Sequence, residues 1–74
     1  AQERIATDVR DALVALRLSE ERARIAREEF RAARQLEVGE RDRFELGDSN
    51  LIFVNIREQT AAEAAARVVD ALLD

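Results

Sequence analysis

Few side chains in this 74-residue sequence could take part in catalysis. The sequence contains no His and no Cys, which excludes an imidazole base, a thiol nucleophile, a disulfide framework and a zinc site of the usual kinds. The adjacent acids Glu20–Glu21 and Glu28–Glu29 would diverge around a helix, so they would not converge on a substrate. The hydroxyl groups belong to Thr7, Ser19, Ser49 and Thr60.

The acids Glu37 and Glu40 have the most suggestive spacing, because residues three apart lie on one face of a helix. A di-metal carboxylate bundle would require a Glu-x-x-His motif, which the sequence lacks. A polar interruption of a helical seam, for register or hydration, is the favoured interpretation. The sequence also lacks a glycine-rich phosphate loop. We therefore predict no catalytic, cofactor-binding or metal-binding residues, and a protein that is not an enzyme.

The composition predicts helices. Hydrophobic residues make up 47% of the chain and charged residues 38%, with two Gly and no Pro to form turns. All 12 basic residues are Arg, and they are interspersed with 16 acidic residues to give a net charge of −4. Such mixed charge argues against nucleic acid as a partner. The longest apolar run, residues 12–16, is too short for a membrane-spanning helix, which needs about 20 residues.

Apolar residues predict a first helix over about residues 2–46, roughly 65 Å long. They recur at the 3.5-residue period of a coiled coil, interrupted at Ser19, Glu37 and Glu40. One heptad position holds Val9, Leu16, Ala23, Phe30 and Phe44, and the other holds Ile5, Ala12, Ala26 and Ala33. A second stripe on another flank holds Leu18, Ile25 and Ala32. A helix that is apolar on two flanks requires neighbours on both sides.

Arginines at steps of seven form a row along the predicted first helix: Arg10, Arg17, Arg24 and Arg31. This row is either a docking ridge or a solvated face held by intrahelical ion pairs, and the second interpretation is favoured. Oppositely charged residues four apart support it, at about 0.2–0.5 kcal/mol per pair. These pairs are Arg17–Glu21, Glu20–Arg24, Arg24–Glu28, Glu37–Arg41 and Arg41–Glu45.

Residues 47–50, Gly-Asp-Ser-Asn, predict a turn. Gly is common just past the C-terminal end of a helix, and Asp, Ser and Asn are preferred N-cap residues at the start of the next helix. Residues 51–54 have strand propensity, but apolar residues at alternating steps of three and four predict a second helix over about 51–74. Leu51, Val54, Glu58, Ala61, Ala65, Val68 and Leu72 form its first stripe, and Phe53, Ile56, Thr60 and Ala64 form a second. We therefore predict an all-α fold, an antiparallel two-helix coiled-coil hairpin comprising residues 1–74 as a single unit.

The two predicted helices differ about twofold in length. In an isolated hairpin, residues before about Val14 would have no partner. We therefore expect that the chain is a piece of a larger protein and that another chain covers this end.

Apolar residues gather around the predicted turn, more than a simple turn requires. The candidate docking residues at this tip are Phe44, Leu46, Gly47, Asp48, Ser49, Asn50 and Leu51. The residues by themselves favour a contact surface and a plain turn about equally.

The sequence around the turn resembles the second hairpin of TolC-type outer-membrane efflux proteins. The resemblance is carried by Arg43-Phe44-Glu45-Leu46-Gly47-Asp48-Ser49, then Leu51, Val54, Arg57-Glu58-Gln59 and the Ala-rich run after Thr60. It is strongest over about residues 27–66.

The resemblance implies a segment of a trimeric export channel. Such proteins form a β-barrel in the outer membrane and a helical tunnel, built from hairpins, through the periplasm. This chain would then be a fragment of that helical barrel, located in the periplasm, with membrane contact only through the β-barrel part. Residues 46–51 would form the entrance and meet a periplasmic adaptor that serves an inner-membrane pump.

The sequence departs from the family at the entrance. Well-known members have a Tyr, an Arg and inward-facing Asp residues there, whereas this sequence has Phe44, Ser49, Phe53 and Ile56 at the matching places. Two alternatives remain open. One is the coiled-coil hairpin of the adaptor (membrane fusion) protein, whose tip usually carries a Gly-Ala-Ile-Ser-like turn; the other is a stand-alone coiled-coil oligomerisation module.

Overall fold

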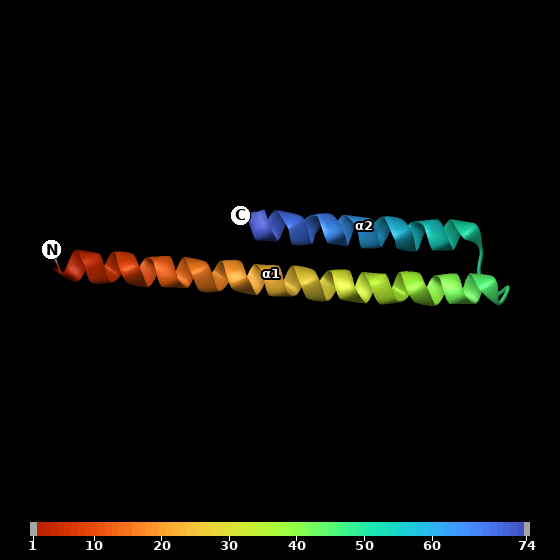
Figure 1. The fold of residues 1–74 in the computed structure, drawn as a ribbon, viewed down its shortest axis with the longest axis horizontal. Coiled ribbons are helices and arrows are strands. Elements are labelled where there is room, and N and C mark those ends of the chain that lie inside the picture. Colours follow the sequence, from red (N-terminus) through yellow and green to blue (C-terminus); the bar gives the residue numbers. More distant parts are fainter. Residues whose placement is uncertain (1, 74) are drawn as a thin grey trace.

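The computed structural model describes residues 2–73, which form two antiparallel helices, α1 (Gln2–Glu45) and α2 (Leu51–Leu73). The helices lie side by side and are joined at one end by a short turn (Figure 1). The Cα atoms extend over 69 × 14 × 10 Å, and no strand occurs within residues 2–73. The predicted all-α helical hairpin is therefore confirmed, with α1 ending one residue before the predicted position 46.

Helix α1 continues without a break through Gly39, which costs a helix about 1 kcal/mol relative to Ala. Intrahelical ion pairs favour the helical conformation along its surface. The guanidinium of Arg24 contacts both Glu21 and Glu28, and its Nη1 atom lies 2.7 Å from Glu28. All four arginines of the predicted row are exposed, but Arg24 alone of the four forms intrahelical ion pairs within residues 2–73, so the favoured interpretation holds in full for Arg24 only.

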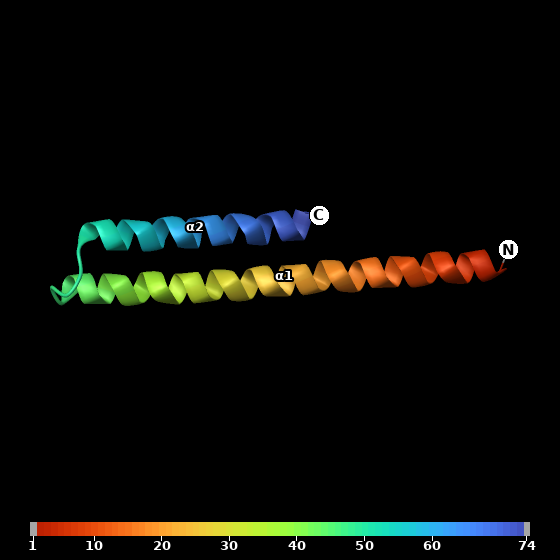
Figure 2. The same ribbon diagram turned by 180° about the vertical axis from the view of Figure 1, so that it is seen from behind.

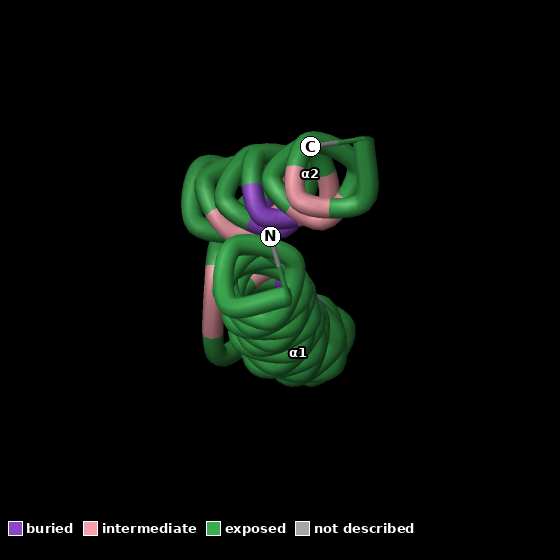
Figure 3. The backbone as a smooth tube through the Cα atoms, turned by 90° about the vertical axis from the view of Figure 1, so that its left-hand side faces the viewer, coloured by how far each residue is buried: buried purple, intermediate pink, exposed green. Residues whose placement is uncertain are grey.

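The two helices meet along a narrow seam of mostly small side chains. Figure 3 shows buried residues where the two backbones face each other. Helix α1 contributes the buried residues Ala23, Ala26, Ala33, Glu37 and Glu40, and α2 contributes Val54, Ala61 and Ala64. Phe30 packs against the cluster formed by Ala33, Ala61 and Ala64. Alanine at these positions lets the helices approach closely, and apolar burial stabilises that contact.

The seam differs in detail from the predicted stripes. Ala64, assigned to the second stripe of α2, is the most buried residue at 1% exposure, and Ala65 beside it is half-buried. Because an α-helix has 3.6 residues per turn, Ala64 and Ala65 lie on either side of the stripe that runs from Ala61 to Val68. Both residues therefore face α1. Phe44 and Leu51, placed in the seam by periodicity, are exposed where the chain turns.

Helix α1 extends well beyond α2, as its red and orange part shows in Figure 2. Every residue from Gln2 to Leu18 is exposed, so the part of α1 without a partner ends slightly later than the predicted Val14. The apolar side chains Ile5, Val9, Leu13 and Leu16 are each at least half exposed. Ile5, Val9 and Leu16 continue the seam pattern past the contact with α2, and Leu13 lies next to that stripe.

Candidate functional site: the hairpin tip

The tip begins with a Schellman motif that ends α1. Gly47 adopts a positive φ of 85°, a backbone conformation that residues with a Cβ disfavour. Its amide donates to the Phe44 carbonyl at 3.0 Å, and the Asp48 amide donates to the Arg43 carbonyl at 2.8 Å. This pair of bonds satisfies carbonyl groups that the end of a helix leaves unpaired.

Asn50 begins α2. Its Oδ1 atom accepts a hydrogen bond from the Phe53 amide at 3.1 Å, the geometry of an N-cap. The Asn50 carbonyl also accepts the first helical bond, from the Val54 amide at 3.2 Å. Of the three cap residues in the sequence, Asn50 takes this role, and Ser49 and Asp48 lie before it in the turn.

The tip presents apolar side chains to its surroundings. Leu46 is 77% exposed and Ile52 is 69% exposed, and Leu51, Phe53 and Phe44 are exposed as well. The candidate residues Gly47, Asp48 and Asn50 are exposed too, whereas Ser49 is half-buried and turns inward. The structure therefore places the predicted tip residues together in one turn, with Ser49 in a different role from the rest.

A buried carboxylate lies beneath the turn. Glu40 is 8% exposed, and its Oε2 atom accepts a hydrogen bond from the Ser49 hydroxyl at 2.6 Å. Arg57 Nε of α2 lies 3.6 Å from Oε1, and Arg43 Nη1 of α1 lies 3.8 Å from Oε2. The Ser49 hydrogen bond, together with Arg43 and Arg57, holds the pKa of Glu40 below its usual value, although burial opposes this change.

Glu37, the other seam acid, has different partners. Arg34 Nη1 and Arg41 Nη2, both of α1, lie 2.8 Å and 3.3 Å from its Oε2 atom. Arg41 also binds Glu58 of α2. Glu37 is thus connected to α2 through Arg41, which also pairs with Glu58. None of its ion-pair partners belongs to the turn. The predicted polar interruption of the seam is in fact two separate arginine-paired sites.

Sequence patterns missed the link between Glu40, Ser49 and Arg57. The heptad pattern put Glu40 in the seam, but nothing in the spacing shows that the turn folds Ser49 back onto it. The signal that could have found it is an acid at a seam position about two helical turns before a Gly-x-Ser turn.

Two of the other hydroxyl groups, those of Thr7 and Thr60, bond within their own helices. Thr7 and Thr60 donate to the carbonyl groups of Glu3 and Ile56, at 2.9 Å and 3.0 Å. No group of three or more acidic side chains within residues 2–73 is arranged to hold a metal ion.

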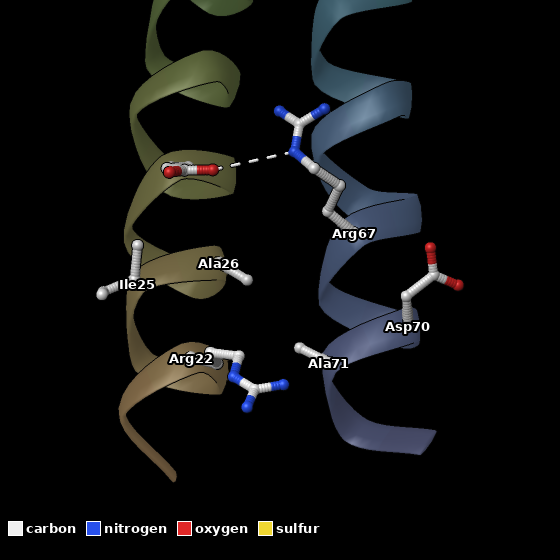
Figure 4. Close-up of a pocket in the computed structure, with 7 residues that line it drawn as sticks. Arg22, Ile25, Ala26, Arg67, Asp70 and Ala71 are labelled. Atoms are coloured by element: carbon white, nitrogen blue, oxygen red, sulfur yellow. Dashed lines mark ion pairs between the residues drawn. The ribbon is translucent and has the colours of Figure 1, made fainter. Parts of the chain in front are cut away.

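A shallow groove lies between the helices at the end away from the tip (Figure 4). Ile25, Ala26 and Ala71 provide apolar surface, and Arg67 Nε lies 3.7 Å from Glu29 Oε2 across the groove. Arg22 and Asp70 complete the lining. The groove is open and shallow, and one ion pair, Arg67–Glu29, crosses it, so the tip remains the stronger candidate for a functional site.

No protein-family model, curated protein or solved structure matches this chain significantly. Within residues 2–73, neither helix combines enough length with enough apolar character to cross a bilayer.

Proposed function

We propose that this hairpin is a wall and entrance segment of a trimeric outer-membrane export channel of the TolC type. In this proposal the helices lie in the periplasm, and the role is structural and conductive. The tip meets a periplasmic adaptor that connects the channel to an inner-membrane pump. The proposal rests on the resemblance around residues 43–59 and on the surfaces that the hairpin leaves uncovered.

The observation that supports it best is the distribution of exposed apolar side chains. Ile25 and Leu36 remain exposed on one flank of α1, although α2 is packed beside it, and Leu18 continues this flank beyond the end of α2. Phe53 and Ile56 remain exposed on α2. A wall of hairpins covers such flanks with neighbouring hairpins, whereas a solitary hairpin leaves them in water.

The tip supports the second half of the proposal. Leu46, Leu51 and Ile52 surround a turn that backbone hydrogen bonds and the Asn50 cap already stabilise. These exposed side chains are therefore not needed to form the turn. A docking surface gives these side chains a use, since apolar anchors carry much of the energy of protein interfaces.

Trifunctional cross-linking tests the proposal in cells that make the whole protein carrying this hairpin. The segment has no native Cys, so Ile52→Cys introduces a single reactive site at the tip. A short tris-maleimide should link three copies covalently and block efflux of a fluorescent dye. Val14→Cys, also exposed but far from the tip, is the matched control and should give little trimer.

Two results would contradict the proposal. One is a tip variant that gives no more covalent trimer than the control. The other is efflux that continues unchanged when the tips are fully cross-linked.

A further inference from the structure

The Glu40 carboxylate is the point at which the turn, α1 and α2 meet. Its Oε2 atom faces Ser49 of the turn and Arg43 of α1, and its Oε1 atom faces Arg57 of α2. A single buried anion therefore joins the three parts of the tip. Hydrogen bonds to an ionised acceptor are stronger than neutral ones, so this joint depends on the charge of Glu40.

We propose that Glu40 is an acid-sensitive latch, which holds the turn 47–50 against the seam when ionised and releases it when protonated. The latch is a property of the hairpin and does not depend on the proposed export function. Protonation weakens the Ser49 hydrogen bond and removes the anion that lies between Arg43 and Arg57. The two guanidinium groups then lose their shared partner. The turn loses its Ser49 attachment to the seam and keeps only the bonds of Gly47 and Asp48 to the end of α1.

The sign of the pH dependence follows from the lowered pKa of Glu40. A carboxyl group whose pKa is lower in the closed state than in the open state favours closure above its ordinary pKa. This contribution disappears as the pH falls through the pKa of the closed state. The latch is therefore closed near neutral pH and opens in acid.

Glu37 provides an internal contrast. It is buried to a similar degree, at 6% exposure, but its partners Arg34 and Arg41 both belong to α1. Arg41 reaches Glu58 on α2, so this chain of charges links the helices without the turn. The contacts of Glu37 therefore do not attach the turn to the seam.

Amide hydrogen exchange, corrected for the intrinsic effect of pH, tests the latch in the whole chain. The Gly47 and Asp48 amides report on the turn through their bonds to α1, and amides of Ala61 and Ala64 report on the seam. Between about pH 6 and pH 3, protection of the turn amides should fall several-fold more than protection of the seam amides.

Three variants make the test specific. Glu40→Gln should show weak turn protection that no longer changes with pH, and Glu37→Gln should keep the response of the unmodified chain. Ser49→Ala, a half-buried turn position, should reduce turn protection at neutral pH even if Glu40→Gln fails to fold. The proposal is overturned if Glu40→Gln keeps the acid response, if turn and seam lose protection in parallel, or if Ser49→Ala leaves the turn amides unchanged.

Discussion

At the scale of single residues, the two glycines have opposite roles although both have open space around them. An added Cβ would meet no atom within 4 Å at either Gly39 or Gly47. Only Gly47 has a positive φ. If Gly→Ala changes the free energy of unfolding differently at the two sites, the cause is therefore the backbone conformation and not steric crowding.

Gly47→Ala should lower the free energy of unfolding by about 1–2 kcal/mol, because an L-residue is strained in the left-handed conformation. Gly39→Ala should raise it by about 1 kcal/mol, because Ala is the better helix former. Urea denaturation followed by circular dichroism measures both values. Changes of the same sign in the two variants would mean that the turn is not where the structure places it.

At the scale of the helices, small seam residues set how closely α1 and α2 approach. Ala61 and Ala64 of α2 face Ala33 of α1 in the most buried part of the hairpin. A larger side chain there has no room unless the helices separate.

Ala64→Leu should therefore destabilise the hairpin by about 1–3 kcal/mol, the usual effect of overpacking. Ala66→Leu is a matched control two residues away on the exposed face of α2, and it should change stability by no more than about 0.5 kcal/mol. The free energy of unfolding again provides the comparison. Equal effects at the two positions would argue against a close-packed alanine seam.

The helices could be predicted from sequence because apolar periodicity and the Gly-Asp-Ser-Asn segment are local signals. Periodicity also overrode the strand propensity of residues 51–54, which form the first turn of α2. The pattern did not show whether Ala64 or Ala65 is more deeply buried against α1. That depends on how α2 is rotated about its own axis, which the periodicity defines only to within one residue. The contact of Ser49 with Glu40 depends on the three-dimensional path of the turn, and no local pattern encodes it.

The ion pairs on the surface also show which contacts a local sequence pattern can and cannot predict. Arg24–Glu28 and Glu37–Arg41 form as four-residue spacing predicted. Arg41, however, reaches Glu58 on the other helix, a partner that only the antiparallel register supplies. The other predicted pairs do not form ion pairs within residues 2–73: Arg17–Glu21, Glu20–Arg24 and Arg41–Glu45. Arg24 instead contacts Glu21, three residues away. Sequence spacing thus predicts some of the pairs within a helix and none across the seam.

At the scale of the whole molecule, the hairpin leaves much apolar surface uncovered. Residues 2–18 of α1 are exposed and continue the seam pattern with larger side chains than the seam itself. Association with further copies would bury Ile5, Val9 and Leu16 and stabilise the helix, since any species that binds the folded state raises its stability.

The melting temperature of the 74-residue chain should therefore rise with protein concentration. Val9→Glu should reduce this dependence, because it places a charge in the exposed stripe. Thr7→Glu, at a position outside the stripe, should retain it. A melting temperature that stays constant over a hundredfold dilution would show that these surfaces do not associate.

The chain folds back at Gly47, and the distance between spin labels on the two helices tests this fold. Labels at the exposed positions 28 and 66 lie near the Glu29–Arg67 ion pair, and a large excess of unlabelled chain isolates the distance within one molecule. The hairpin predicts a short distance, about 10 Å between helix axes plus the label arms. A single unbroken helix would separate the labels by roughly 57 Å, at about 1.5 Å per residue, and that result would contradict the hairpin.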